Sequence, residues 1–414
     1  MVTSEDCLSL NVWTPASSTD VRLPVMVWIH GGAFKRGSGG LFVGKHLAAH
    51  GNVVVTLNYR LNIFGFLALN ALSTEDDSYP TSGNYGLEDQ HLALEWVQQN
   101  IANFGGDPGN VTLFGESAGG ISVCGHLVSP ASKGLFHRAI LQSGPCDLDM
   151  SLKQAEPTGE KVISTLGCDK AENVLECIRG KSVEELLAVR SYFFPVFDGV
   201  VLPDAQTTLL AQGAFSKVPV LLGTNKDEGT RQTLFFGGQT NLDEVQYQSA
   251  VEKMFASSNI DAAAVLAQYP VSSYPNPSWA LAAIKGEWQF NCPIRRNARA
   301  MAARVNTYFY YLTYERPTPM GKIGAFHTED LEFVFFETKR KGFQLKENEK
   351  GLSHAMMGYW SRFAKTGNPN GDAAVAWPAY NIAGDQYIEF ALNNIQVKSG
   401  LLSRCDFWDT WAEK

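Results

Sequence analysis

The sequence predicts an α/β fold, in which a mostly parallel central sheet carries helices on both faces. Strand-like and helix-like segments alternate through the first half of the 414-residue chain. The strand-like segments are almost continuously apolar, as expected for strands that are buried on both faces of a parallel sheet. The strands predicted in this half are Leu8–Trp13, Val25–Ile29, Val53–Tyr59, Val111–Phe114 and Ala139–Gln142.

A helix is predicted between the third and fourth of these strands, over residues 88–104. Ala93, Val97, Ile101 and Phe104 recur there at helical spacing, so we expect them to form one buried face. The glycines and proline that follow end the helix.

The second half contains two helical stretches, at about 151–216 and about 241–303. Strands are predicted at Val218–Leu222, Thr307–Thr313 and Gln386–Phe390. Ligands of open α/β sheets bind beyond the carboxyl ends of the strands, so helices inserted at these places would wall a pocket. No segment resembles a linker, and we expect one domain with two helical insertions.

Composition and charge exclude several function classes. The chain has 34 basic and 42 acidic residues and no basic run that could follow a phosphate backbone, so we expect no nucleic-acid partner. No apolar stretch approaches the roughly 20 residues that a membrane span needs. The sequence lacks clusters with zinc-like spacing, and we expect neither a metal nor an organic cofactor. We expect a soluble protein, cytoplasmic or secreted or periplasmic, and the sequence leaves its compartment and oligomeric state open.

A G-x-S-x-G pentapeptide at 115–119 is the first chemical signal. An apolar strand precedes it and a helix-compatible segment follows, which is the strand–serine–helix context that a nucleophilic Ser117 needs. Glycine is expected on both sides because a Cβ would obstruct the sharp turn. An isolated match of this kind is about as often an ordinary turn.

A second motif makes the ordinary turn improbable. The strand ending at Ile29 runs into His30-Gly31-Gly32-Ala33-Phe34, which matches the H-G-G-G type of segment that supplies backbone donors in esterases. A nucleophile and a site for a developing oxyanion are therefore predicted together.

A serine hydroxyl needs a base, and the base needs a carboxylate to orient it. In hydrolases of this strand order the acid follows the serine and the histidine comes last. His126 and His137 lie too close after the serine, and His354 lies in a helical pattern, so His327, in a loop beyond a strand, is the best candidate.

The acid is sought on loops at the carboxyl ends of strands. The strand predicted to end at Leu222 leads to Asp227 and Glu228, and spacing alone does not choose between these neighbours. Asp198 and Asp204 remain weaker rivals.

With these residues assembled, the chain resembles the type B carboxylesterase and cholinesterase-like family of α/β-hydrolases, which includes bacterial para-nitrobenzyl esterases. The resemblance implies the α/β-hydrolase fold, with helical insertions over the active site, and hydrolysis of small-molecule carboxylic esters through an acyl-serine intermediate. The segments that carry it span nearly the whole chain: Glu5–Val12, Trp28–Phe34, Asn58–Arg60, Phe114–Gly120, Gln142–Gly144, Asn225–Gly229 and His327 with the Glu-Asp-Leu that follows.

The family pattern implies a role for each matching residue. Ser117 would be the nucleophile, Glu228 rather than Asp227 the orienting acid, and His327 the base. The oxyanion hole would be formed by the backbone amides of Gly32, Ala33 and Ala118. Ala33 replaces the third glycine of the motif, which is harmless to a backbone donor if the local angles permit a Cβ.

Two further expectations follow from the resemblance. Relatives usually carry more strands before the Glu-Asp-Cys-Leu segment, which begins here at residue 5, so we interpret the chain as shortened at its N-terminus, with a wider pocket mouth. Of the seven cysteines, Cys7 would be a free thiol, while Cys168 with Cys177 and Cys292 with Cys405 resemble family pairs. The alternatives to an esterase are a cholinesterase-like non-catalytic binding protein and an inactive, truncated remnant.

Overall fold

The structure is a computed structural model that describes residues 4–318, 321–340, 344–400 and 404–412. Nine strands form a mostly parallel sheet, and helices separate most of them along the chain. The predicted α/β class is therefore confirmed.

Contacts within the chain divide it into two compact units, which are described separately. Unit 1 comprises residues 1–140 and 146–218, and unit 2 comprises residues 141–145 and 219–414. The expectation of one domain with two helical insertions stays a prediction.

Unit 1 contains four strands of the sheet, and the strand β5 (Arg138–Gln142) crosses from unit 1 into unit 2. The strands and helices of unit 1 are β1 (Leu10–Trp13), β2 (Leu23–Ile29), α1 (Lys45–Ala48), β3 (Val53–Leu57), α2 (Asn62–Phe66), α3 (Asn70–Ser73), α4 (Tyr85–Asn100), β4 (Gly106–Glu116), α5 (Ala118–Val128), α6 (Leu152–Thr165), α7 (Val174–Arg179), α8 (Val183–Ala188) and α9 (Gln206–Gln212). Short 3₁₀ turns add η1 (Gly39–Leu41), η2 (Ile101–Phe104) and η3 (Pro130–Ser132).

The sheet of unit 1 is centred on β2. This strand pairs in parallel with β3 and with β4, and Val25 lies opposite Val53 on one side and Val111 on the other. Residues 24–29 of β2 and all of β3 are buried, which explains their unbroken apolar sequences. β1 pairs antiparallel with β3 at the edge.

The buried face of the helix predicted over 88–104 differs in part from the expectation. Val97 and Ile101 are buried, but Ala93 is half-buried and Phe104 is exposed. The α-helix ends at Asn100 and continues as the 3₁₀ turn η2, whose tighter winding rotates Phe104 out of the helical register. The Phe104 ring lies 5.9 Å from that of Trp96 instead.

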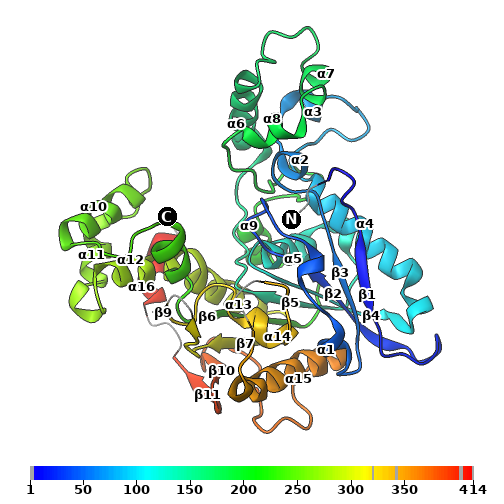
Figure 1. The fold of residues 1–414 in the computed structure, drawn as a ribbon, viewed down its shortest axis with the longest axis vertical. Helices are drawn as coiled ribbons and strands as arrows, with labels where there is room; N and C mark the ends of the chain where they lie inside the picture. Colours follow the sequence, from blue (N-terminus) through cyan, green and yellow to red (C-terminus); the bar gives the residue numbers. More distant parts are fainter. Residues whose placement is uncertain (1–3, 319–320, 341–343, 401–403, 413–414) are drawn as a thin grey trace. The chain divides into compact units, whose positions relative to one another are not determined.

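The predicted helical stretch at 151–216 contains α6 to α9. Capping boxes begin α6 at Ser151 and α8 at Ser182, so the starts of both helices are encoded locally. In unit 1, α7 packs against α3 and α8 against α2, and Figure 1 shows these short helices gathered at one end of the unit.

Unit 2 contains the other sheet strands and a helical group. Its strands and helices are β6 (Val220–Asn225), α10 (Glu244–Phe255), α11 (Ala262–Gln268), α12 (Pro277–Gly286), α13 (Cys292–Ala302), β7 (Thr307–Leu312), β8 (Pro317–Thr318), β9 (Gly321–Lys322), α14 (Asp330–Phe335), α15 (Lys350–Thr366), β10 (Gln386–Ala391), β11 (Asn394–Ser399) and α16 (Cys405–Ala412). Two π-helical turns, η4 (Arg231–Phe236) and η6 (Glu287–Asn291), and two 3₁₀ turns, η5 (Val271–Ser273) and η7 (Glu347–Glu349), complete it.

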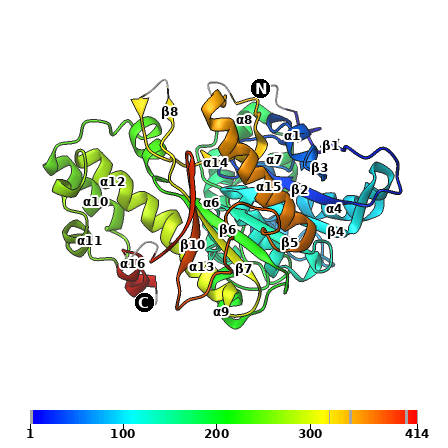
Figure 2. The same ribbon diagram turned by 90° about the horizontal axis from the view of Figure 1, so that it is seen from below.

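The sheet of unit 2 has β7 between two parallel neighbours, β6 and β10, and β11 returns antiparallel beside β10. Side chains alternate along β7: Tyr308 and Tyr310 meet Phe363 and Trp360 of α15, at 6.1 and 5.3 Å between ring centroids. Figure 2 shows α13 and α15 running beside these strands. The sequence did not predict β11, whose side chains are half-buried or exposed and therefore carry no unbroken apolar signal.

The predicted helical stretch at 241–303 contains α10 to α13. Figure 1 shows α10, α11, α12 and α16 packed together within unit 2. Their shared core includes Tyr247, Phe255, Tyr269, Leu281 and Trp408. The C-terminal helix α16 is therefore part of this helical group.

Candidate active site

Ser117 lies on a strained turn between β4 and α5. Its backbone has φ 55° and ψ −124°, an unusual conformation for a residue with a side chain. The residue is only half-buried although both of its neighbours are buried. This is the strand–serine–helix arrangement expected from the sequence, and the strain marks a position whose geometry the surrounding fold imposes.

The glycines beside Ser117 are required by close backbone contacts. A Cβ on Gly119 would lie 2.0 Å from the carbonyl oxygen of Ile29, and one on Gly115 would lie 2.4 Å from the carbonyl carbon of Gly119. Both distances are far shorter than van der Waals contact. The expectation that a side chain would obstruct the turn is confirmed by this geometry.

The segment after β2 lies against the serine turn. A Cβ on Gly31 would come within 3.1 Å of the Ser117 Cβ and 2.6 Å of the Glu116 carbonyl oxygen, so the backbone of the loop approaches the serine closely. Gly32 has φ 122°, and Ala33 and Phe34 both have φ 56°. The loop is closed by the amides of residues 35 and 36, which donate to the Gly32 carbonyl, each at 3.1 Å.

Three backbone amides, one in the serine turn and two in the loop after β2, are candidate donors. Ala118 is the first residue of α5, so its N–H has no acceptor within the helix. For the amides of Gly32 and Ala33, no hydrogen bond is found among the residues that the structure describes. Ala33 holds a left-handed conformation with its Cβ exposed, so its methyl group is accommodated.

His30 supports the loop and is not a candidate base. Its ring is buried, the Nδ1 atom lies 2.8 Å from the Gly31 carbonyl oxygen, and burial lowers the pKa to about 4. The ring stacks on Tyr59, whose hydroxyl donates to the His30 carbonyl at 2.8 Å. A Cβ on Gly37 would lie 2.3 Å from Nδ1, so this side chain is enclosed by the loop that it supports.

In unit 2, Glu228 and His327 form a direct pair. The Nδ1 atom of His327 lies 2.6 Å from Oε2 of Glu228, and the glutamate is fully buried. The imidazole packs against the ring of Phe290, with 4.6 Å between centroids. A carboxylate on Nδ1 leaves Nε2 as the nitrogen that can exchange a proton with another group.

The other oxygen of Glu228 accepts three hydrogen bonds. The donors are the Ser143 hydroxyl at 2.6 Å, the Thr224 hydroxyl at 2.8 Å and the Asn225 amide at 2.7 Å. All three residues are buried. Buried charge requires such partners, so the carboxylate is held in one position with its negative charge compensated.

Asp227, the neighbour of Glu228, points to a different partner. It accepts from the Ala325 amide at 2.9 Å, and its own amide donates to the Ala325 carbonyl at 2.8 Å. Burial raises the pKa of its carboxyl to about 6. Asp227 therefore supports the loop that carries His327, while Glu228 contacts the imidazole itself.

The remaining sequence candidates are engaged elsewhere. His126 is buried between Ser132 and Gln90, and His137 accepts from the Val111 amide. His354 lies on the exposed side of α15. Asp198 binds the hydroxyl of Thr81 and two amides of its own loop, and Asp204 binds the next amide in its chain.

The Ser117 turn and the Glu228–His327 pair can now be compared with known proteins. The sequence pattern of the Carboxylesterase family matches residues 1–408. The chain belongs to this family. Family membership carries the α/β-hydrolase fold, and the protein is a serine carboxylesterase that hydrolyses carboxylic esters.

Curated relatives of this carboxylesterase agree. It is 37% identical to human "Cocaine esterase" over 430 residues, which cover 98% of this chain and 75% of the relative. It is 36% identical to mouse "Acylcarnitine hydrolase" over 431 residues, with the same coverages of 98% and 75%. It is 37% identical to mouse "Carboxylesterase 1F" over 416 residues, 91% of this chain and 72% of the relative.

The residues around Glu228 were missed as functional residues by sequence reasoning. Ser143 and Asn225 lie in the Gln-Ser-Gly and Asn-Lys-Asp-Glu-Gly segments, which signalled the family but no role. Gln142 donates to Asp330 at 2.6 Å, and Asn225 donates to the Phe326 carbonyl at 3.0 Å. Three of the family segments, Gln142–Gly144, Asn225–Gly229 and the one that begins at His327, are therefore parts of one hydrogen-bonded network around Glu228 and His327.

The cysteines pair as three disulfides. Cys168–Cys177 and Cys292–Cys405 confirm the pairs that the resemblance implied, and Cys7 is free, as expected. The sequence did not predict Cys124–Cys146, because α5 and the segment after β5 bring these positions to a Cα separation of 5.6 Å only in the fold. Disulfides are typical of proteins from oxidising compartments.

The described residues include no group of three or more His, Cys, Asp or Glu side chains that could hold a metal ion. Among the helices of the described ranges, none is both long and apolar enough to span a bilayer.

Proposed function

We propose that this carboxylesterase uses Ser117, His327 and Glu228 as its catalytic triad. Ser117 attacks the ester carbonyl while His327 accepts the hydroxyl proton at Nε2. The imidazolium then gives this proton to the leaving alcohol. Water repeats the cycle on the acyl-serine and releases the acid.

The observation that carries the proposal is the 2.6 Å hydrogen bond between Glu228 and His327. This bond supports Glu228 rather than Asp227 as the acid, and His327 rather than another histidine as the base. Sequence spacing alone did not choose between the two acids. The bond orients the ring and stabilises the charge that the imidazole gains.

We further propose that the amides of Gly32, Ala33 and Ala118 form the oxyanion hole. Their support is the close approach of the Gly31 backbone to Ser117 and the availability of these three N–H groups. Removing one such donor typically raises the barrier by about 2.7–4 kcal/mol. In this proposal, the positive φ angles of the loop after β2 orient its N–H groups toward the oxygen on which negative charge develops.

The substrate that we propose is a small-molecule carboxylic ester. The test is turnover of para-nitrophenyl acetate and butyrate by the wild-type chain and by Ser117→Ala. We expect rapid turnover that the variant loses. Turnover by Ser117→Ala at the wild-type rate would contradict Ser117 as the nucleophile, and a wild-type rate equal to the uncatalysed background would favour a non-catalytic binding role.

A further inference from the structure

Resting on the proposed function, we propose that Asn291 is a positioning residue for Glu228, acting by directing the Thr224 hydroxyl proton onto the carboxylate. Asn291 has no sequence signal of its own and lies 63 positions beyond the acid in the chain. Its contact is with Thr224, whose hydroxyl donates to Oε1 of Glu228, the carboxylate oxygen that does not face His327, so Asn291 acts on the carboxylate through Thr224.

Asn291 is placed by a π-helical turn. The helix running from α12 to α13 is interrupted by η6 (Glu287–Asn291), where the backbone takes up one π turn. Single π turns inside α-helices are rare and occur frequently at functional sites. The last two residues of this turn lie beside the Glu228–His327 pair: Phe290 packs on the His327 ring, and Asn291 contacts Thr224, which donates to Glu228.

The Thr224 hydroxyl accepts a hydrogen bond from Asn291 and donates one to Glu228, and these directions define the role of Asn291. A threonine hydroxyl has one proton, and two acceptors lie near it: Glu228 Oε1 at 2.8 Å and the Asn225 carbonyl at 3.5 Å. The Asn291 amide donates to both the hydroxyl oxygen, at 3.2 Å, and that same carbonyl, at 2.8 Å. Because the Asn291 N–H donates to the hydroxyl oxygen, the hydroxyl's own proton must point to another acceptor, and Glu228 Oε1 at 2.8 Å is much nearer than the Asn225 carbonyl at 3.5 Å.

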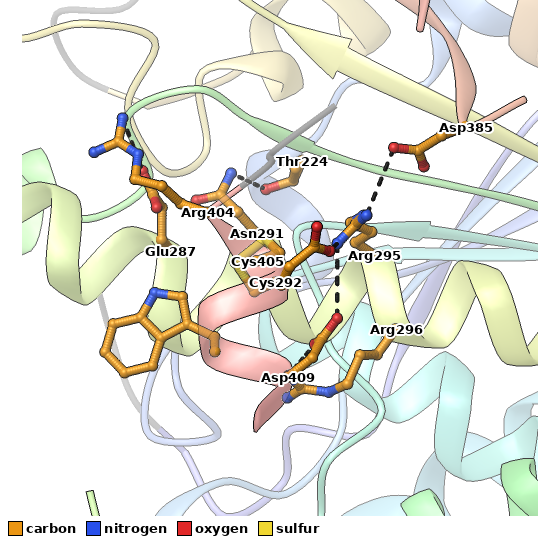
Figure 3. Close-up of a disulfide and its surroundings, with 12 residues drawn as sticks. Thr224, Glu287, Asn291, Cys292, Arg295, Arg296, Asp385, Arg404, Cys405 and Asp409 are labelled. Atoms are coloured by element: carbon orange, nitrogen blue, oxygen red, sulfur yellow. Dashed lines mark hydrogen bonds and ion pairs between the residues drawn. A yellow bond between two sulfur atoms is a disulfide. The ribbon is translucent and has the colours of Figure 1, made fainter. Parts of the chain in front are cut away.

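The turn is held firmly at both of its ends. At its start, the Tyr269 hydroxyl donates to Glu287 at 2.6 Å, and Arg404 lies 3.6 Å from the same carboxylate. At its end, Cys292 is joined to Cys405 of α16, as Figure 3 shows beside the Asn291–Thr224 contact. Ion pairs from Arg295 to Asp406 and from Arg296 to Asp409 fix α16 further.

The turn also lies directly against the acid. A Cβ on Gly286 would come within 2.8 Å of the Gly229 amide nitrogen and 3.4 Å of the Glu228 Cβ. There is no space for the turn to shift without moving the acid loop. Asn291 is fully buried, so water cannot replace its amide.

The first test is a double-mutant cycle between Asn291→Leu and Thr224→Val, with kcat and KM measured on para-nitrophenyl butyrate. We expect Asn291→Leu to lower kcat about tenfold, as for loss of one hydrogen bond to a charged group, with KM little changed. In the Thr224→Val background the same substitution should cost less than about twofold. Thr233→Val, which removes a buried hydroxyl with no hydrogen-bond partner among the described residues, is the matched control and should leave kcat unchanged.

If Asn291→Leu does not fold, Asn291→Asp replaces it. This variant keeps the shape but turns the donor into an acceptor, so we expect a loss of kcat at least as large. The proposal would be overturned if the fold-losses in kcat of the two single variants multiplied in the double variant. It would also be overturned if the Asn291 variant that folds had the kcat of wild type.

A readout independent of turnover separates this inference from the proposed function. The strongly hydrogen-bonded proton between Glu228 and His327 should give a downfield proton resonance, identified by its loss in His327→Gln. We expect Asn291→Leu to shift or broaden it and Thr233→Val to leave it unchanged. A shifted resonance in a protein that hydrolyses no ester would refute the proposed function alone, and an unchanged resonance would refute the role of Asn291.

Discussion

The Ser117 turn of unit 1 and the Glu228–His327 pair of unit 2 are built by different means. Ser117 is held by backbone: close contacts at Gly115 and Gly119, and a loop with three consecutive positive φ angles from Gly32. Glu228 and His327 are held by side chains, through hydrogen bonds from residues that are far apart in the sequence. The first region therefore depends on the absence of a Cβ at Gly115 and Gly119, and the second on hydrogen bonds between side chains.

The largest expected effect separates the two adjacent acids of the side-chain region. Glu228→Gln should lower kcat by about 10³–10⁴-fold, because the histidine loses the carboxylate that sets its tautomer. Asp227→Asn should lower it far less, since an amide oxygen can still accept from Ala325. Steady-state kinetics of the two variants decide this, and the reverse ranking would show that the acid is wrongly assigned.

The backbone region is tested by adding a single methyl group. Gly119→Ala places a Cβ 2.0 Å from a carbonyl oxygen, so we expect a loss of about 3 kcal/mol in the free energy of unfolding. Gly125→Ala in the same helix is the control. Its Cβ would lie 3.6 Å from the nearest atom, so it should be neutral or stabilising by up to about 1 kcal/mol. Similar stabilities from denaturant melts would contradict the backbone account.

Two of the disulfides allow a further comparison, because Cys292–Cys405 holds the end of η6 beside Glu228 and Cys168–Cys177 lies in unit 1. Cys292–Cys405 closes a separation of 113 residues and Cys168–Cys177 one of 9. On the chain-entropy account, replacing Cys292 and Cys405 by serines lowers the free energy of unfolding by roughly 5 kcal/mol, and replacing Cys168 and Cys177 lowers it by roughly 2.6 kcal/mol. Only loss of the first pair should also lower kcat. Equal kcat for both serine pairs would show that α16 is irrelevant to the acid.

The smallest expected effect is a pH dependence of stability from Asp227. Burial raises its pKa from 3.8 to about 6, so the folded state binds this proton more tightly than the unfolded state. Its ionisation therefore costs stability as pH rises from about 4 to about 6, by at most about 3 kcal/mol. Relative to wild type, Asp227→Asn should gain stability across this window. Denaturant melts from pH 4 to 7 measure the gain, and a difference that does not vary with pH would contradict it.

The contrast between the regions also explains what the sequence could predict. The serine turn and its loop are local motifs in which each glycine has a steric reason, so Ser117 and residues 30–34 could be identified directly. The residues that hold Glu228 come from remote segments: Ser143 lies in a family segment that indicates no role, and Thr224 and Asn291 have no local pattern. Asp227 and Glu228 are adjacent, so spacing could not rank them, and only the fold turns their side chains to different partners.

The most direct measurement is reaction of the folded protein with a fluorophosphonate, followed by mass spectrometry of its peptides. The account predicts a covalent adduct on Ser117 in the wild-type chain and slow or absent labelling in Glu228→Gln and His327→Gln. Labelling at another residue, or labelling of Ser117 at the same rate in all three proteins, would contradict it.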